Sequence, residues 1–205
     1  MSTRLSFAAA LGAVLLFAGC GKEEPAIEII QPQATPGAVL PKHWSIPDFT
    51  LTERCGQPLR RADLDGKIWI VDFIYTTCPG PCPMLTSRLS DIQKAIGNDP
   101  DVRLVSISVD PESDTTKVLT EYAERYKAGP NWFFCTGSKE AIYALIKEGF
   151  KFPVADAPTS GGLITHTTRV VVVDKTGTVR SFHEGEKAES VAAVLSDILQ
   201  LKQEK

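Results

Sequence analysis

A nearly continuous apolar run at residues 67–75, KIWIVDFIY, constrains the fold more than any other part of the sequence. β-Branched and aromatic residues without regular polar alternation are expected in a β-strand that is covered on both faces. Strands of this kind form parallel sheets with helices on either side. The run therefore predicts a central strand of an α/β sheet.

Strand-like and helix-like segments alternate after this run, as in α/β proteins. Helices are predicted where apolar residues recur every three or four positions, and strands where β-branched residues cluster. Ser138 is placed to cap one helix and Gly149 to end it. A central mixed β-sheet flanked by helices is the expected architecture. The predicted helices cover residues 84–96, 114–126, 139–149 and 188–202, and the further strands cover residues 103–110, 132–135, 165–174 and 178–185.

The N-terminus has the pattern of an export signal. Met1 to Arg4 supply a positive end, LSFAAALGAVLLF supplies an apolar run, and AGC ends at Cys20. The apolar run is shorter than the roughly 20 residues that span a bilayer, so we expect residues 1–19 to be a cleaved signal peptide. The ending LLFAGC resembles a bacterial lipoprotein signal, which implies lipidation of Cys20. A plain signal peptide is the alternative.

Residues 20–42 are predicted to form a flexible tether. This segment has four prolines and no aromatic residue before Lys42, so it cannot bury enough apolar surface to offset the entropy of ordering. With Cys20 lipidated, the tether would hold a domain of residues 43–205 on the outer side of a bacterial cytoplasmic membrane.

Charge and cysteine usage limit the classes of function. The chain has 25 acidic and 22 basic residues, a net charge of −3, and no basic stripe, which argues against a nucleic-acid partner. Export implies an oxidising compartment, where a cysteine pair forms a disulfide unless something reduces it.

Two of the five cysteines, Cys78 and Cys82, follow the apolar run directly, in YTTCPGPCPML. Pro81 and Pro83 allow a helix to begin there. Spacing of four along a helix start would put both sulfurs on one face, within disulfide range and able to converge on one ion. Unpaired amides at a helix start favour the thiolate, which is the form that attacks and that binds metal. Geometry alone leaves a Cys78–Cys82 redox pair and half of a metal site equally open.

A third ligand would decide between these alternatives, and His166 is the candidate among the three histidines. His43 lies at the edge of the tether and His183 beside the acidic EGE, so both are predicted to be solvated. His166 precedes the buried strand of GGLITHTTRVVVVD, where a purely structural histidine is the alternative. Two thiolates and an imidazole form a soft set suited to copper, especially Cu(I), whereas a structural zinc site would usually need a fourth protein ligand.

Three motifs carry a family resemblance. VDFIYTTCPGPC resembles the strand-to-active-site passage of thioredoxins, with one residue added between the cysteines. FIYTTCPGPCP, SVDPESDT and LITHTTRVVVVDKTGTVR, in that order, resemble the SCO/SenC family over roughly residues 43–202. The resemblance implies a thioredoxin-like fold and copper ligands at Cys78, Cys82 and His166. The chain departs from the family at Thr165, where many members have an aspartate.

The resemblance implies a copper metallochaperone that delivers Cu(I) or Cu(II) to the binuclear copper site of a cytochrome c oxidase subunit during assembly. Another copper chaperone or a thiol reductant is a further implied partner. The alternative is an enzyme, a thiol–disulfide reductase that uses Cys78 and Cys82 to keep the oxidase copper-site cysteines reduced. A copper-sensing or peroxide-consuming module is a third alternative.

Four residues lie outside this pattern. Asp72, in the apolar strand, is either a proton acceptor for cysteine chemistry or a strand-edge carboxylate with a hydrogen-bond partner. Asp114, in SVDPESDT, is expected on a loop near the cysteine face, and capping of the helix that follows is enough to explain it. Cys55 and Cys135 belong to no motif, and the sequence does not decide whether they form a disulfide with each other.

Overall fold

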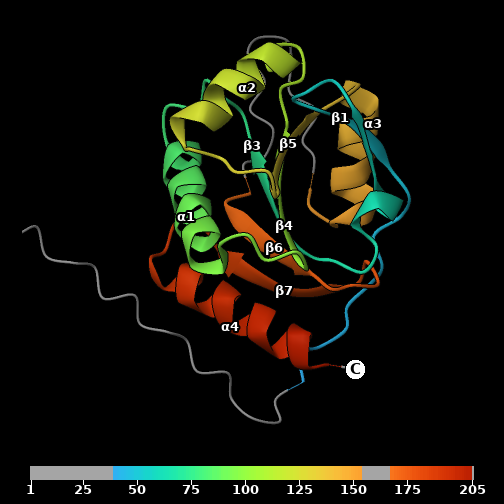
Figure 1. Ribbon diagram of the computed structural model, residues 1–205. Helices are drawn as coiled ribbons and strands as arrows, with labels where there is room; N and C mark the ends of the chain where they lie inside the picture. Colours follow the sequence, from blue (N-terminus) through green and yellow to red (C-terminus); the bar gives the residue numbers. More distant parts are fainter. Residues whose placement is uncertain (1–38, 154–166, 205) are drawn as a thin grey trace, which may run out of the picture.

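The chain forms a seven-stranded mixed sheet in the computed structural model, which describes residues 39–153 and 167–204 (Figure 1). The strand order is β2-β1-β5-β4-β3-β6-β7. The three central strands, β5, β4 and β3, run parallel, and the outer strands pair antiparallel to their neighbours. The strands are β1 (Thr50–Glu53), β2 (Pro58–Arg60), β3 (Ile68–Ile74), β4 (Val102–Ser108), β5 (Trp132–Thr136), β6 (Arg169–Val173) and β7 (Val179–Glu184).

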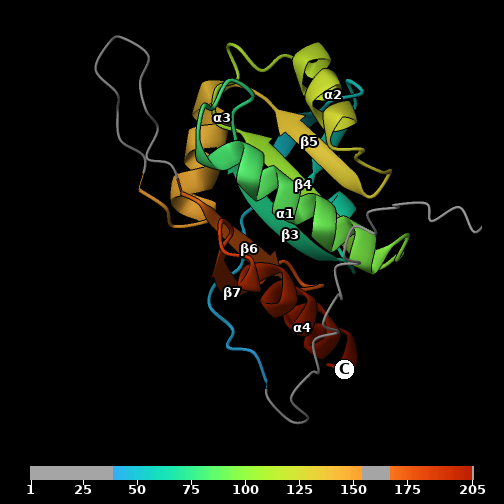
Figure 2. The same cartoon turned by 90° about the vertical axis from the view of Figure 1, so that its left-hand side faces the viewer.

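Helices cover both faces of this sheet, as Figures 1 and 2 show. One face packs against α1 (Pro81–Ile96), α2 (Thr116–Arg125) and α4 (Glu189–Gln203), and the other packs against α3 (Lys139–Ala144). All seven residues of β3 are buried. Ile70 and Ile74 join the cluster under α1, α2 and α4, whereas Trp69 and Phe73 join the cluster under α3. The alternation explains why the β3 sequence is apolar throughout, and the predicted mixed sheet flanked by helices is confirmed.

Two local features differ from the sequence-based expectations. The β1–β2 hairpin was not predicted, because its strands are only four and three residues long and contain several polar residues. The helix predicted over residues 139–149 is α-helical only to Ala144 and continues as a π-helical turn over Leu145–Gly149. Ser138 caps its start as predicted, with its hydroxyl accepting from the Ala141 N–H at 3.2 Å.

A buried arginine joins both ends of the described chain. The Arg180 guanidinium, 1% exposed, donates to the carbonyls of Leu40 at 2.6 Å and Pro41 at 3.0 Å. It also pairs with Glu204 at 2.7 Å and with Asp174 at 3.0 Å. A buried charge needs such partners to offset its lost hydration. The contact lies beside the end of α4, at the opposite end of the sheet from the start of α1 (Figure 1).

No helix in the described part of the chain combines the length and apolar character needed to cross a bilayer.

Candidate functional site

The turn between β3 and α1 carries the two cysteines. β3 ends at Ile74, and the Tyr75 carbonyl accepts from the Cys78 N–H at 3.2 Å, which closes a tight turn. Gly80 then caps α1, whose first residue is Pro81. Cys82 therefore lies in the first turn of the helix as predicted, but Cys78 precedes the helix rather than belonging to it. Both are free thiols, with exposed fractions of 7% and 5%.

The contacts of the Cys78 sulfur favour its thiolate. The Cys82 N–H donates to Cys78 Sγ at 3.5 Å. Burial opposes ionisation, but hydrogen bonds from the Cys82 thiol, from the Cys82 and Gly80 N–H groups and from Tyr75 hold the pKa of Cys78 below its usual value. Backbone donors at a helix start stabilise anions in this way. Cys78 is therefore the nucleophilic member of the pair.

Cys82 has the opposite tendency. Burial, followed by its hydrogen bond to Cys78, raises the pKa of Cys82 to about 12. Cys78 therefore loses its proton before Cys82 does, and Cys82 holds its proton where Cys78 is ionised. A ligand that binds both sulfurs must displace that proton.

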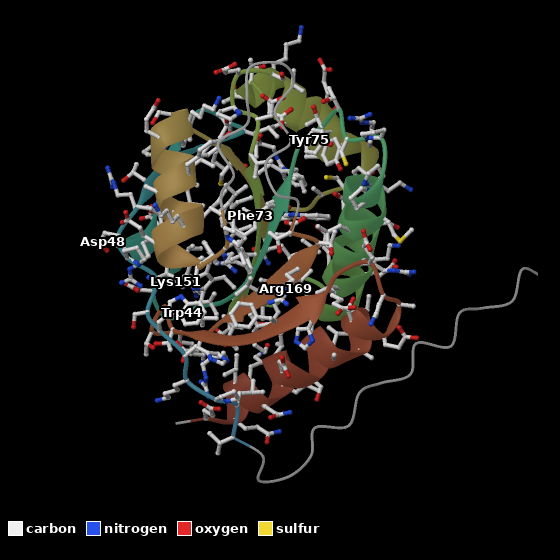
Figure 3. The ribbon with its side chains drawn as sticks, turned by 180° about the vertical axis from the view of Figure 1, so that it is seen from behind. Trp44, Asp48, Phe73, Tyr75, Lys151 and Arg169 are labelled. Carbon is white, nitrogen blue, oxygen red and sulfur yellow. The ribbon has the colours of Figure 1, made fainter. Side chains whose placement is uncertain are left out.

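Tyr75, labelled at the end of β3 in Figure 3, is a site residue that sequence reasoning missed. Burial first, and then its hydrogen bond to Cys78, raises the pKa of Tyr75 to about 12. Its hydroxyl therefore keeps its proton and can donate to the thiolate. Its position three residues before Cys78 was the signal in the sequence that could have identified it as a site residue.

Asp72 lies fully buried in the middle of β3, not at a strand edge. Its Oδ1 accepts from the Ser106 hydroxyl at 2.6 Å, which confirms a hydrogen-bond partner, and Trp132 Nε1 donates to that hydroxyl at 2.9 Å. Its Oδ2 has no hydrogen-bond partner among the described residues. Burial outweighs the Ser106 hydrogen bond and raises the pKa of Asp72 to about 7. Its charge also contributes to the raised pKa of Cys82, so the two groups are electrostatically coupled.

A family model described as SCO1/SenC matches residues 40–200. The chain belongs to the SCO1/SenC family. Its sheet and helices form the thioredoxin-like fold that its motifs predict, in agreement with solved Sco structures.

Three solved structures illustrate the SCO1/SenC relationship. A SCO1/SenC family lipoprotein from Bacillus anthracis str. Ames is 31% identical, with a TM-score of 0.72 over 78% of this chain and 96% of that one. BsSco is described as a member of the Sco family of cytochrome c oxidase assembly proteins, with a disulfide switch. It is 30% identical, with a TM-score of 0.69, and the match covers 79% of this chain and 95% of BsSco. Bradyrhizobium japonicum ScoI with copper bound is 28% identical, with a TM-score of 0.64, and the match covers 76% of this chain and 99% of ScoI.

His166, the predicted third ligand of this SCO1/SenC protein, lies outside the described residues, as do Thr165 and Cys20. Within residues 39–153 and 167–204, no three histidine, cysteine, aspartate or glutamate side chains are grouped to hold a metal ion. The described part of the site therefore supplies two sulfur donors.

The start of β6 lies close to α1 in this SCO1/SenC fold. The Gly185 N–H, just after β7, donates to the Thr168 carbonyl at 2.8 Å. A Cβ atom on Gly185 would collide with Leu85 of α1 and would lie 2.8 Å from that same carbonyl oxygen. Thr168, which leads into β6, is therefore a neighbour of Leu85, one helical turn after Cys82.

Two predicted roles are wrong. The helix α2 is capped by Thr115, whose hydroxyl accepts from the Val118 N–H, and not by Asp114. Asp114 is fully buried and binds Thr76 and Ser108 instead. His183 is not solvated, because its Nε2 lies 2.7 Å from Asp197 Oδ2 and its side chain is only 16% exposed.

The remaining cysteines and the other histidine lie away from this pair. Cys55 is exposed, Cys135 is buried in β5, and both are free thiols. His43 is exposed as predicted and packs against Trp44 and Phe182.

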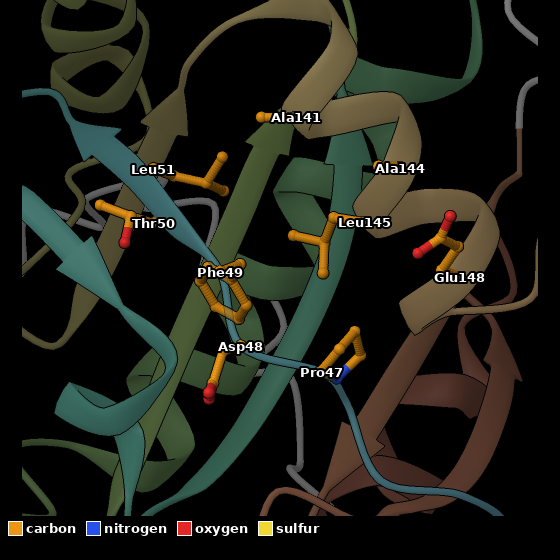
Figure 4. A pocket seen from close by; sticks show the side chains of 9 residues that line it. All are labelled: Pro47, Asp48, Phe49, Thr50, Leu51, Ala141, Ala144, Leu145 and Glu148. Atoms are coloured by element: carbon orange, nitrogen blue, oxygen red, sulfur yellow. The ribbon is translucent and has the colours of Figure 1, made fainter.

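A pocket, shown in Figure 4, lies between the segment that leads into β1 and α3, on the face of the sheet that α3 covers. Its lining includes Phe49, Leu51 and Leu145 with the acidic Asp48 and Glu148, but no cysteine or histidine. It therefore offers no soft ligand for copper.

Proposed function

We propose that this protein is a copper metallochaperone that binds one copper ion through Cys78, Cys82 and His166. It would deliver the ion to the cytochrome c oxidase subunit that carries the binuclear copper site. The observation that carries this proposal is the buried thiol pair at the start of α1, in which Cys78 favours its thiolate. The copper bound to ScoI and the assembly role of BsSco support it.

The position of β6 supports His166 as the third ligand. Thr168 is a neighbour of Leu85 in α1, and His166 precedes Thr168 by two residues. Two residues of extended chain span about 7 Å, and this short separation from Thr168 is our ground for proposing His166 as the third ligand.

Transfer would proceed by ligand exchange. Copper first meets the Cys78 thiolate and then displaces the proton of Cys82, so the affinity for copper should rise with pH. A partner cysteine replaces one ligand at a time, and each bond made offsets one that breaks. Oxidation of Cys78 and Cys82 to a disulfide releases two protons and two electrons and removes both thiolates, so only the reduced form would hold copper tightly.

Ligand substitution tests this proposal. Cys78→Ala and Cys82→Ala should each lower copper affinity by more than about 100-fold, because a directly bound donor matters more than an outer-shell residue. With Cu(II), wild type should show a sulfur-to-copper charge-transfer band that either substitution removes. Cys55→Ala is the matched control, since it removes an exposed thiol of the same chain. Copper retention by Cys78→Ala against a competing chelator, equal to that of Cys55→Ala, would refute the site.

A second candidate function follows from the unequal thiols. A thiol–disulfide reductase needs one thiolate that attacks and a second thiol that resolves the mixed disulfide, and Cys78 and Cys82 fit these roles. The disulfide of the substrate would accept the two electrons and two protons that Cys78 and Cys82 lose.

His166→Ala separates the two functions, because disulfide exchange needs only the thiols. The variant should keep exchange activity and lose stable Cu(II) binding. In a strain that lacks the wild-type protein and grows at limiting copper, it should not restore cytochrome c oxidase activity, and added copper should restore part of it. Full rescue by His166→Ala, with Cys78→Ala inactive, would leave the reductase as the function.

We also propose that residues 1–19 are removed and that a lipid on Cys20 holds the domain on the outer side of the cytoplasmic membrane. The sequence LLFAGC and the lipoprotein from B. anthracis support this location.

A further inference from the structure

The turn that carries Cys78 is tied to a distant loop. Residues 75–78 form this turn, closed by the hydrogen bond from the Cys78 N–H to the Tyr75 carbonyl. Thr76, its second residue, donates its N–H to both carboxylate oxygens of Asp114, at 3.3 and 3.2 Å. The Thr76 hydroxyl donates to Asp114 Oδ1 at 2.6 Å. Asp114, 38 positions along the chain, therefore accepts both polar hydrogens of Thr76.

Asp114 is itself held in place. It is 0% exposed, and its Oδ2 accepts from the Ser108 hydroxyl at 2.6 Å. Ser108 ends β4, and its Oγ also accepts from the Asp110 N–H at 3.1 Å. The Asp114 N–H donates to the Asp110 carbonyl at 2.9 Å. The carboxylate is thus fixed to β4 on one side and to the cysteine turn on the other.

Hydrogen bonds to a buried carboxylate are shorter and stronger than neutral ones, and removing such an acceptor leaves buried donors unsatisfied. We propose that Asp114 is a positioning residue for the Cys78–Cys82 pair: it anchors the turn that carries Cys78 and thereby sets the balance between the dithiol and the disulfide. This inference deepens the proposed function, because it concerns the same pair that would bind copper.

The direction of the effect follows from what holds the turn in each state. In the dithiol, the turn depends on noncovalent contacts, among them the three hydrogen bonds from Thr76 to Asp114. In the disulfide, the Cys78–Cys82 bond itself ties the turn to α1. Loss of Asp114 therefore destabilises the dithiol more than the disulfide, and the pair becomes easier to oxidise.

The test is a redox equilibrium without copper. Purified protein is equilibrated with mixtures of reduced and oxidised glutathione, and the Cys78–Cys82 dithiol is trapped and counted. Each dithiol oxidised gives two electrons and two protons to one oxidised glutathione, which becomes two glutathione thiols. Asp114→Ala should shift the equilibrium constant toward the disulfide by about tenfold, equivalent to about 30 mV for this two-electron couple. Asp114→Asn, which keeps one acceptor oxygen, should shift it less.

Asp174→Ala is the matched control. Like Asp114, Asp174 accepts both polar hydrogens of one threonine: the Thr176 N–H at 2.9 Å and the Thr176 hydroxyl at 2.7 Å donate to Asp174 Oδ1. The Thr178 N–H also donates to this oxygen, at 3.1 Å. It lies in the β6–β7 turn, away from the cysteines, so its loss should lower the free energy of unfolding without moving the redox equilibrium.

Equal redox shifts in the Asp114 and Asp174 variants, or none in either, would overturn the inference. Should Asp114→Ala not fold, Thr76→Val removes the hydroxyl donor alone, and a smaller shift in the same direction is expected; the absence of that shift would also overturn it. Copper binding by wild type is measured separately. A wild-type protein that binds no copper would refute the chaperone proposal while the redox shift still tests Asp114.

Discussion

At the scale of single residues, Asp72 is the clearest conflict between sequence and environment. The other six residues of β3 are apolar, and the carboxyl group is fully buried among them with one oxygen unpaired among the described residues. Burial of this kind disfavours the charged form, which is why the pKa of Asp72 rises from 3.8 to about 7. The group therefore changes charge within the physiological pH range.

A change in protonation on folding makes stability depend on pH. Between pH 4 and 7 the folded protein holds a proton on Asp72 that the unfolded chain has released. The free energy of unfolding should therefore fall as pH rises through this window, by up to about 4 kcal/mol. Asp72→Asn cannot ionise, so the variant should lack this fall and be more stable than wild type at pH 8.

Urea unfolding at several pH values from 4 to 8 measures this effect. Asp48→Asn is the control, because the Asp48 side chain is 96% exposed. Parallel stability curves for wild type and Asp72→Asn would contradict the expected titration.

Sequence predicted the site residues whose signal is local, and missed those whose role depends on distant partners. Cys78 and Cys82 were predicted from spacing and from the strand before them. The partner of Asp114 is Thr76, 38 positions away, and that of Asp72 is Ser106, 34 positions away. Asp114 was correctly expected near the cysteines, but its role was taken to be helix capping, which is a local pattern. The pairs with Thr76 and Ser106 arise only when β3 and β4 lie side by side.

At the scale of elements, α1 is positioned by the strands that pass beside it. The chain after β7 crosses α1 at Gly185, where only a hydrogen atom fits between Leu85 and the Thr168 carbonyl. This close approach brings the start of β6 to the helix that carries Cys82.

Gly185→Ala should separate these elements. Its Cβ would lie 2.8 Å from the Thr168 carbonyl oxygen and 2.9 Å from Val170 Cγ2, in addition to the collision with Leu85. Overpacking of this kind costs about 1–3 kcal/mol. If Cys82 and His166 share a copper ion, the variant should also bind copper more weakly.

Gly149→Ala serves as the matched control for this variant. Its Cβ would lie 2.8 Å from Leu145 Cδ1 on the other face of the sheet, so it should lower stability and leave copper affinity unchanged. Equal copper affinities in the two variants, measured under chelator competition, would contradict the proposed arrangement.

The elements that could be predicted are those with a clear pattern of apolar residues along the sequence. Residues 67–75 predicted β3 because a strand buried on both faces needs apolar side chains at every position. The β1–β2 hairpin has no such signal, and its pairing with β5 depends on a contact between Glu53 and Cys135 that is remote in sequence. The π-helical turn after Ala144 is similarly set by packing, since Gly149 lies against Leu145 and binds Trp44.

At the scale of the whole molecule, the proposed anchor is separable from the folded domain. The contacts of Arg180 begin at Leu40, and the site residues Cys78 and Cys82 belong to the folded sheet. Cys20→Ser should therefore keep the fold and copper binding while the protein moves from the membrane fraction to the soluble fraction, because the lipid would be the only strong attachment.

Fractionation after a salt wash measures this release from the membrane. Thermal unfolding and copper titration of each variant serve as controls for the fold and for the copper site. Cys55→Ser, which alters a cysteine inside the domain, should stay with the membrane. A Cys20→Ser protein that remains in the washed membrane would refute lipidation as the anchor.

The Arg180 contact also determines how a mechanical load would pass through the molecule. Arg180 binds the Leu40 and Pro41 carbonyls and also Glu204, which caps the end of α4. This contact lies at the end of the sheet away from the start of α1 (Figure 1). Tension on the N-terminal segment would be borne by β7, Asp174 and the last turn of α4. The turn that carries Cys78 lies at the other end of the sheet and would carry little of this load.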